Sequence, residues 1–406
     1  MAVLAAQPLS VLVAPDSFKG SASAEEVCAA VAAGVRGVCP DARVTTVPMA
    51  DGGEGSLDAL MAAWHVRPTE VTTVDALGRP CTARLGLAPG GRTAVVELAE
   101  ASGLPRVSDR PPAPLDAHTV GAGELARAAL DAGAEEVLVL VGGSASTDGG
   151  TGILHALGVR FRDAAGEAVR PGGRHLARIA TVDVTGLHPR ARAVRWRIAV
   201  DVDNPLTGPR GAAAVFGPQK GADRDDVAAL ERGLQSYARV LATAAGCEPT
   251  SLTTLPGGGA AGGVPVGLHA LLGAELAPGS RLVADAVGLA EAMTGADLVI
   301  TGEGACDDQS LHGKVVDLVA TTARGLPRPP AVVVLAGAVR VGQDELAGHG
   351  VAAALSIAPG PATLAELTGR TAELLAERAG AVTGLYLAGR AAAQRTVEPA
   401  AVPPGD

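Results

Sequence analysis

Three lysine residues are the basic side chains whose type and position most clearly suggest chemistry. The chain has 33 Lys and Arg residues, of which only Lys19, Lys220 and Lys314 are lysines. Each has a glycine neighbour, in the segments FKG, QKG and GK. A compact ammonium group beside a flexible glycine loop suits a phosphate oxygen better than the larger planar guanidinium of arginine does. Together the lysines indicate phosphate chemistry, whereas any single one also fits an ordinary surface charge.

Glycine-rich loops with acidic neighbours recur along the chain. They are DGGEG at 51–55, GGSASTDGG at 142–150, GGGAAGG at 257–263 and TGEGACDDQ at 301–309. Backbone N–H groups in such loops, at the beginning of a helix, bind anions without needing a cationic side chain. The loops at 142–150 and 301–309 are the best placed for this, because each follows an apolar, strand-like run.

The segment DVDNPL at 201–206 offers oxygen-bearing side chains directly after the strand-like run WRIAV. It contains Asn204, the single asparagine of the chain. Open α/β sheets bind ligands at the carboxyl ends of their strands, so Asp201 or Asp203 could serve as a general base or a magnesium ligand. We favour Asp201 as the base, with Asp307 as its main rival. The alternative for Asp201 and Asn204 is turn formation and capping.

Several well-known motifs are absent or match only weakly. The chain has no GxxxxGK[ST] loop and no protein-kinase HRD or DFG set. The GxGxxG at 257–262 and the GxGxxA at 121–126 do not follow a clear strand, as a dinucleotide-binding fingerprint requires. GGSAS resembles a nucleophile elbow but ends in Ser where Gly is expected, so a hydrolase is disfavoured.

Length and composition narrow the class of protein. A chain of 406 residues is longer than one hydrophobic core usually grows, so we expect two domains. The net charge of −10, without Lys/Arg runs, argues against nucleic-acid binding. Neither a long apolar stretch nor a signal-peptide pattern is present, which argues against a membrane or secreted protein. The five scattered cysteines predict no disulfide framework or zinc site and fit a reducing cytoplasm.

The elements that must position these residues alternate between strand and helix. Apolar runs predict strands at 11–13 and near 71–75, 93–98, 137–141, 196–201, 297–301 and 331–335. Helical spacing predicts helices at 24–37 and near 55–64, 121–132, 150–157, 223–246, 313–323 and 361–395, the first with a capping box formed by Ser23 and Glu26. We interpret 163–195 as a long surface connection and expect a disordered tail at 396–406. The alternation predicts an α/β fold with helices on both faces of the sheets.

Taken in order, the loops resemble the type 1 glycerate kinase family. The matching segments are APDSFKGSASAEEV, VPMADGGEGSLDAL, VGGSASTDGGTGILHALG, DVDNPLTGPRGAAAVFGPQKGA, PGGGAAGGVPVGLHALLGAEL and DLVITGEGACDDQSLHGKV. The resemblance implies phosphorylation of D-glycerate, usually at the 2-hydroxyl, by ATP with Mg²⁺. It also implies two α/β domains: a flavodoxin-like parallel-sheet domain built from both chain ends, and a second, mixed α/β domain inserted in it, with the active site in the cleft. We place the first domain at 1–70 and 283–395 and the inserted domain at 71–282.

The family motifs fall on Lys19, Asp51, Glu54, Ser144, Asp201, Asn204, Lys220, Glu303, Asp307, Gln309 and Lys314. We expect catalytic roles for Asp201, Lys19 and Asp307, and magnesium binding by Asp201 and Asp307. We expect substrate or phosphate binding by Asp51, Gly52, Gly53, Glu54, Gly142, Gly143, Ser144, Asn204, Lys220, Gly258, Gly259, Gly262, Gly302, Glu303, Gln309 and Lys314.

The chain departs from the family at two places. Ala305 stands where the family commonly has Arg, and 113–118 reads APLDAH where Asp-Pro-Leu and a Thr-rich run are common. A missing guanidinium removes a contact to phosphate or carboxylate. Other interpretations therefore stay open: a kinase for another small 2-hydroxy acid, a dinucleotide-dependent oxidoreductase, or a nucleotide-binding protein without turnover. A homodimer also stays open.

Overall fold

The computed structural model describes residues 8–397, which divide into two compact units. Unit 1 is built from residues 1–49 and 287–406, and unit 2 from residues 50–286. The expected boundary after residue 70 is wrong, because the chain enters unit 2 earlier. The reason is the helix α2 (Ser56–Trp64), which packs against strands of unit 2: its Leu57 and Met61 side chains lie over Gly86.

Unit 1 contains a five-stranded sheet in the order β2-β1-β11-β12-β13, and every pairing in it is parallel. Counted within the unit, this is the 2-1-3-4-5 order of flavodoxin-like folds. The expected flavodoxin-like fold is therefore confirmed. The strands are β1 (Ser10–Val13), β2 (Arg43–Thr46), β11 (Leu298–Cys306), β12 (Ala331–Val339) and β13 (Ala353–Ser356). The helices are α1 (Ala24–Val38), α11 (Leu289–Met293), α12 (Val315–Arg324), α13 (Gln343–Gly348), α14 (Leu364–Gly369) and α15 (Thr371–Val397), with a short 3₁₀ helix η5 (Asp308–Leu311).

Side-chain alternation along the strands gives this sheet two apolar faces. Val333 and Leu335 of β12 join the cluster of α1 and α15, whereas Val334 and Ala336 join the cluster of α12. Helix α1 begins as expected: Ser23 Oγ accepts a hydrogen bond from the Glu26 N–H, and the Glu26 carboxylate accepts one from the Ser23 N–H. The result is a sheet covered on both faces, as a parallel sheet requires.

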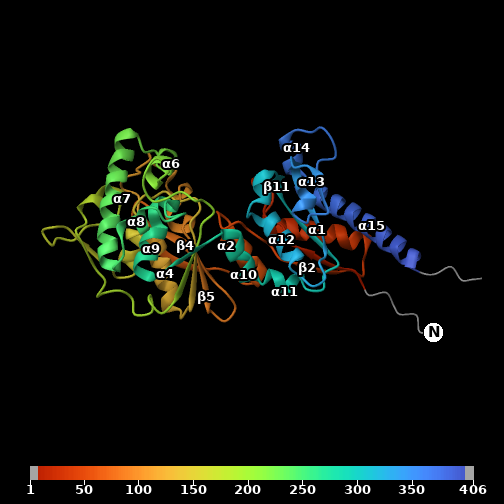
Figure 1. Cartoon of the computed structure of the whole chain (residues 1–406), viewed down its shortest axis with the longest axis horizontal. Helices are drawn as coiled ribbons and strands as arrows, with labels where there is room; N and C mark the ends of the chain where they lie inside the picture. The colour runs from red at the N-terminus through yellow and green to blue at the C-terminus, as the bar shows by residue number, and fades with distance from the viewer. Residues whose placement is uncertain (1–7, 398–406) are drawn as a thin grey trace, which may run out of the picture. The chain divides into compact units, whose positions relative to one another are not determined.

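Helices α1 and α15 lie side by side (Figure 1) because small residues let their backbones approach. A Cβ atom on Gly34 would overlap the carbonyl oxygen of Ala376, whereas one on Gly37, in the same helix, would meet nothing within 4 Å. We expect Gly34→Ala to lower the free energy of unfolding by about 1–3 kcal/mol through overpacking. Gly37→Ala should instead raise it by up to about 1 kcal/mol, because alanine favours the helix.

Urea unfolding followed by circular dichroism measures both substitutions. The two variants carry the same chemical change in one helix, so each is the control for the other. Equal effects of the two substitutions would contradict close packing of α1 on α15.

Unit 2 is built on a six-stranded sheet in the order β10-β9-β6-β5-β4-β3, in which β10, β9, β6 and β5 are mutually parallel and β4 is antiparallel to both of its neighbours, β5 and β3. This matches the expected mixed α/β domain.

The strands of unit 2 are β3 (Thr69–Val74), β4 (Pro80–Leu87), β5 (Thr93–Glu97), β6 (Glu136–Leu140), β9 (Arg195–Ala199) and β10 (Glu275–Ala277), and β7 (Arg160–Arg162) and β8 (Thr181–Asp183) form a separate hairpin. Besides α2, the helices are α3 (Ala99–Ser102), α4 (Val120–Asp131), α5 (Thr151–Ala156), α6 (Ala212–Phe216), α7 (Arg224–Ala245), α8 (Pro249–Thr253), α9 (Val264–Leu272) and α10 (Gly279–Val287). The 3₁₀ helices are η1 (Pro105–Val107), η2 (Gly173–Arg178), η3 (Pro218–Lys220) and η4 (Ala260–Gly263).

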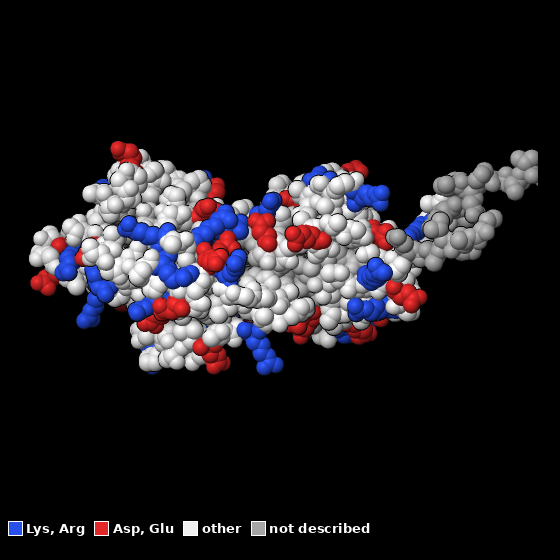
Figure 2. Space-filling view, turned by 90° about the horizontal axis from the view of Figure 1, so that it is seen from below, with Lys and Arg blue, Asp and Glu red and all other residues white. Residues whose placement is uncertain are grey.

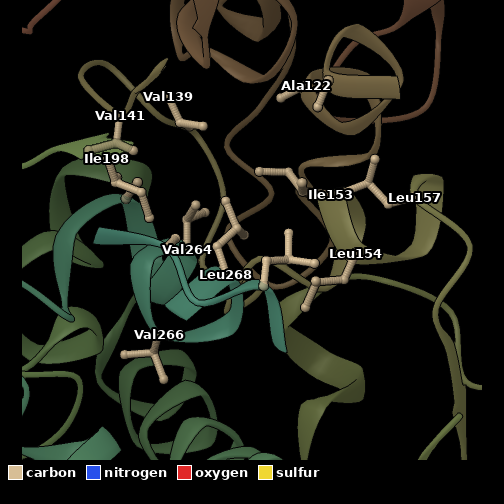
Figure 3. Packing of buried hydrophobic residues seen from close by; sticks show 14 of the residues in the cluster. Ala122, Val139, Val141, Ile153, Leu154, Leu157, Ile198, Val264, Val266 and Leu268 are labelled. Carbon is tan, nitrogen blue, oxygen red and sulfur yellow. The ribbon is translucent and has the colours of Figure 1, made fainter. Parts of the chain in front are cut away.

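The core of unit 2 is aliphatic, as a composition with 2% aromatic residues demands. Figure 3 shows part of it, where Ile153 and Leu154 of α5 lie in one cluster with Val264 and Leu268 of α9. Trp196 and Tyr237, two of the few aromatic residues, are fully buried in the same cluster.

Our interpretation of 163–195 as a surface connection is wrong. The segment contains η2 and β8, and Leu176 and Ile179 are buried in the core of unit 2. Only isolated apolar residues of this segment are buried in the core, so its sequence shows no hydrophobic periodicity. Each strand expected from an apolar run is present. The edge strands β2, β10 and β13, the internal strand β4 and the hairpin strands β7 and β8 were missed, because they lack such a run. Of the expected disordered tail, residues 396 and 397 end α15 and the rest lie outside the described residues.

No helix in residues 8–397 combines the length and the apolar character needed to cross a membrane.

Candidate active site

The carboxyl ends of β5, β6, β9 and β10 lie at one edge of the unit 2 sheet, because these strands are parallel neighbours. Glu97 ends β5, the loop Gly142–Ser144 follows β6, Asp201 follows β9 and Gly279 follows β10. Open sheets bind ligands at this edge. Residues from four separated segments therefore meet where a ligand site is expected.

The DGGEG loop joins this edge through close backbone contacts. A Cβ atom on Gly52 would lie 2.6 Å from the Cα of Gly279, and one on Gly142 would lie 2.9 Å from the Cα of Gly53. The Asp51 carboxylate accepts a hydrogen bond of 3.0 Å from the Gly53 N–H. The glycines thus allow three loops to pack backbone against backbone, where side chains would not fit.

Glu97 is a buried carboxylate that sequence reasoning missed. Its side chain is 3% exposed and accepts hydrogen bonds from the backbone N–H groups of Gly55, at 3.1 Å, and Leu57, at 2.9 Å. It therefore anchors the DGGEG loop and the beginning of α2. Burial, opposed by these two hydrogen bonds, raises the pKa of Glu97 to about 7. The signal was an acidic residue at the end of the apolar run TAVVE.

Lys220 is buried, with 3% of its surface exposed, and its ammonium group is bound by the protein. Its Nζ donates to Ser144 Oγ at 3.0 Å and, over a shorter distance, to the carbonyl oxygen of Ser146. Burial lowers the pKa of Lys220 to about 7, against an opposing effect of Asp148. We expected Lys220 to bind phosphate; in the structure its contacts hold the loop after β6.

Asp148 is a second carboxylate that we did not predict. It is fully buried and accepts hydrogen bonds from the backbone N–H groups of Thr119, Gly150 and Gly152 at 2.9, 3.1 and 3.0 Å. It also accepts one from the Thr119 hydroxyl. Asp148 therefore fixes the path of the chain from the glycine loop into α5. Nothing in the local pattern separates it from an exposed loop aspartate.

Asp201 lies exposed at the end of β9, and one of its carboxylate oxygens accepts a hydrogen bond of 2.8 Å from the Gly279 N–H, where α10 begins. This contact joins Asp201 to a helix start 78 residues away rather than to its own turn, and it orients the carboxylate at the ligand edge. Asp203 instead forms an exposed ion pair with Arg210 at 2.7 Å. The Asn204 amide donates to the carbonyl oxygen of Arg210 at 2.8 Å, a contact within its own turn.

The remaining glycines that we expected to bind phosphate in unit 2 are buried against other loops. A Cβ atom on Gly259 would overlap the carbonyl oxygen of Pro205, and one on Gly262 that of Ser146. One on Gly258 would lie 2.9 Å from the carbonyl oxygen of Leu255. Close packing therefore accounts for this loop, and no strand directly precedes it. The GxGxxA match falls inside α4, so neither match has the context of a dinucleotide-binding fingerprint.

Lys19 is placed in unit 1 by a tight loop after β1. The Phe18 N–H donates to the Ala22 carbonyl and the Ala22 N–H to the Phe18 carbonyl, so Lys19 and Gly20 form the exposed tip. A cavity of about 370 Å³ is lined by residues 17–23 and Glu26. A Cβ atom on Gly304 would lie 3.8 Å from the Lys19 backbone N, which places the loop against the end of β11. The structure thus brings Lys19 together with the segment of Gly302 and Glu303.

Asp307, Gln309 and Lys314 follow β11 in a short connection to α12. The Asp307 carboxylate caps η5 by accepting a hydrogen bond of 3.1 Å from the Gln309 N–H. Lys314 is the residue before the first turn of α12. The glycines beside Lys19, Lys220 and Lys314 all adopt left-handed φ angles, of +80°, +92° and +85°. Turn geometry thus explains the glycine beside each lysine, which we had attributed to phosphate binding.

Asp201 belongs to unit 2 and Asp307 to unit 1, and these were the two expected metal ligands. Within residues 8–397, no group of three or more His, Cys, Asp or Glu side chains is arranged to hold a metal ion. All five cysteines are free thiols. On the face that Figure 2 shows, basic and acidic side chains are interspersed, which agrees with the absence of Lys/Arg runs from the sequence.

Comparison with known proteins gives one consistent result. The profile of the glycerate kinase family matches residues 11–387. A glycerate kinase of Bacillus subtilis (strain 168) is 42% identical over 90% of this chain and 95% of its own length. A glycerate 2-kinase of Escherichia coli (strain K12) is 40% identical over 88% of this chain and 93% of its own. A crystal structure of a candidate glycerate kinase 2 from Salmonella typhimurium LT2 superposes with a TM-score of 0.85 at 40% identity, covering 94% of this chain and 99% of that one. The chain therefore belongs to the glycerate kinase family.

Proposed function

We propose that the protein transfers the γ-phosphoryl group of ATP to the 2-hydroxyl of D-glycerate, giving 2-phosphoglycerate. Membership of the glycerate kinase family supports the reaction, and the name of the Escherichia coli relative supports the position of transfer. Phosphoryl transfer needs positioned reactants and stabilisation of negative charge, with little covalent chemistry from the protein. Five free cysteines support a cytoplasmic location.

The observation that carries this proposal is the backbone packing of the glycine loops in unit 2. The position of a Cβ atom on Gly52 is only 2.6 Å from the Cα of Gly279, so the two loops leave room for main chain alone. Amide groups in such loops attract phosphate or carboxylate oxygens even in a chain of net charge −10. The dinucleotide-dependent reaction is disfavoured, since neither glycine match lies between a strand and a helix.

We assign the general base to Asp201 and charge stabilisation to Lys19. Asp201 is exposed at the carboxyl edge of the sheet and oriented by Gly279, so it can accept the proton of the attacking hydroxyl. Lys19 is exposed on a tight loop beside a cavity, so its ammonium group can meet an anionic substrate. Lys220 acts by holding the position of Ser144.

Magnesium fits the residues only as a partner of ATP. Mg²⁺ keeps several waters and is often held by one or two carboxylates together with substrate phosphates. The described residues contain no cluster of three or more metal-binding side chains. When bound, the ion would neutralise phosphate charge, and we propose that the exposed carboxylate of Asp201 or the half-buried carboxylate of Asp307 would hold it.

The proposal is tested by ADP release from magnesium ATP with D-glycerate, with enolase added as the coupling enzyme. Enolase consumes 2-phosphoglycerate directly, so an immediate enolase signal identifies transfer to the 2-hydroxyl. ADP release without an immediate enolase signal would show that the phosphate is transferred to a hydroxyl other than the 2-hydroxyl. Ala305, which lies in β11 opposite Ala338, replaces the arginine that is common in the family. The assay is therefore repeated with a panel of other 2-hydroxy acids. No ADP release above a control without enzyme, for any of these acids, would overturn the proposal.

A further inference from the structure

Unit 2 holds a second cavity, of about 450 Å³, which Lys220 lines together with residues that have no role in the site described above. Its volume lies within the range of small-molecule sites, about 300–1,000 Å³. The walls are mainly apolar and include Leu77, Leu104, Val107, Pro112, Ala117 and Ala145. Ala117 and Ala145 are buried, and Leu77, Leu104 and Val107 are half-buried against them. A preformed apolar pocket of this size needs a ligand with an apolar body.

One wall of this pocket is joined through the chain to the glycine loop after β6, whose residues 142–144 do not themselves line the pocket. Ala145, in its wall, follows Gly142–Ser144 directly in the chain. The Leu104 N–H donates to the Gly143 carbonyl at 2.9 Å, and the Ala145 N–H donates to the Ser102 carbonyl at 2.9 Å. These two hydrogen bonds fix the loop beside the pocket wall, so a ligand whose body fills the pocket can direct its other end toward residues 142–144.

Four polar side chains also line the cavity: Ser108, Arg110, Gln219 and Lys220. Gln219 and Lys220 belong to η3 and both line the cavity. Lys220 is held by Ser144, and a Cβ atom on Gly221 would overlap Pro112, so this segment is locked against the pocket wall. Gln219 itself is exposed. Its amide offers a donor and an acceptor together, the pattern with which glutamine recognises the edge of adenine.

The reactants differ sharply in how well they suit this pocket. Glycerate is a three-carbon acid without an apolar body, so even with its carboxylate at Arg110 or Lys220 it would leave the apolar walls of the pocket unfilled. A purine has flat apolar faces and a polar edge, and its triphosphate lies at one end. On this ground, and resting on the proposed kinase function, we infer that the pocket receives the adenine ring of ATP, with Gln219 at its polar edge and the phosphates directed toward Gly142–Ser144.

Filling the pocket tests the inference. Ala113 lines the cavity and is half-buried, whereas Ala165 lies exposed in a turn of the same unit. We expect Ala113→Phe to raise KM for ATP by about tenfold or more, with KM for glycerate changed by less than about twofold. Ala165→Phe is the matched control and should leave both constants unchanged. An unchanged KM for ATP in folded Ala113→Phe would overturn the inference.

Base selectivity gives a second readout at the polar edge. GTP differs from ATP in the groups that Gln219 would contact, so Gln219→Leu should reduce the ratio of kcat/KM for ATP to that for GTP by about tenfold. An unchanged ratio would remove Gln219 from the inference.

Photolabelling of the wild type with an azido-substituted ATP locates the base without any turnover. We expect labelled peptides from residues 104–117, protected by excess ATP. Labelling elsewhere in an active enzyme would overturn the adenine assignment and leave the kinase function intact. If the wild type transfers no phosphate, the proposed function fails, and protected labelling at 104–117 still supports a nucleotide pocket.

Discussion

Asp201→Asn lowers kcat by about two to four orders of magnitude, the usual contribution of a general base, and leaves KM for ATP nearly unchanged. The substitution is suited to this test because asparagine keeps an oxygen that can accept the 2.8 Å hydrogen bond from the Gly279 N–H. The loop geometry is thereby preserved, and the change is confined to the charge and basicity of the side chain. Steady-state kinetics with both substrates varied provides the measurement.

Asp203→Asn is the matched control, because Asp203 lies two residues away, is exposed, and forms an ion pair with Arg210. An exposed ion pair contributes about 0–1 kcal/mol, so we expect near-normal kcat in this variant. If Asp201→Asn retained near-normal kcat, the general base would be Asp307, or the reaction would use no protein base. Loss of ATP affinity in Asp201→Asn would make Asp201 a metal ligand.

The second large effect concerns stability and pH, through the two buried titratable groups Lys220 and Glu97. The pKa of Lys220 is about 7 in the folded protein and 10.5 ordinarily. Between these values the unfolded chain binds more protons, so the free energy of unfolding rises with pH, by at most about 1.4 kcal/mol per pH unit. The stability cost of burying Lys220 is therefore fully present below pH 7 and is relieved above it.

Glu97 acts over a different pH range and with the opposite sign. Its pKa is about 7 in the folded protein and 4.5 ordinarily. Between these values the folded protein binds more protons, so the free energy of unfolding falls as pH rises. The two contributions together produce a minimum of stability near pH 7.

Two variants separate these contributions in urea titrations from about pH 5 to about pH 9. Relative to the wild type, Lys220→Met should be most favourable below pH 7 and lose that advantage as pH rises further. The stability of Glu97→Gln relative to the wild type should rise as pH increases between 4.5 and about 7, the ordinary and the folded pKa of Glu97, and should level off above that range. Each variant is the control for the other. Stability curves of Lys220→Met and wild type that run parallel at all pH values would show that Lys220 stays charged when buried.

Local patterns predicted the elements and their alternation well. The apolar runs of β5, β6, β9, β11 and β12 identified strands because both faces of these strands are covered. The capping box at Ser23 and Glu26 identified the start of α1, since its hydrogen bonds join residues three apart. The edge strands β2, β10 and β13, the internal strand β4 and the segment 163–195 escaped prediction because their apolar residues do not form a continuous run.

The site was predicted only in part, for the same physical reason. The loops at 51–55 and 142–144 and the position of Asp201 were recognised from glycine content and from the strands before them. The burial of Lys220 was not, because its partner Ser144 lies 76 residues away in the chain. Glu97 contacts Leu57 across 40 residues, and Asp148 contacts Thr119 across 29. Contacts between residues so far apart in the chain leave no periodic pattern in the local sequence.

The sequence alone therefore determined the α/β class, the phosphate chemistry suggested by its loops, and the family to which the loops are similar. These properties reside in short segments, in which residue type, spacing and backbone preference act within one element. The tertiary structure decided the strand orders, the division at 49/50 and 286/287, and which lysine is buried and which is exposed. Those properties depend on which distant segments share a sheet edge, because burial and close backbone contact arise only when the chain has folded.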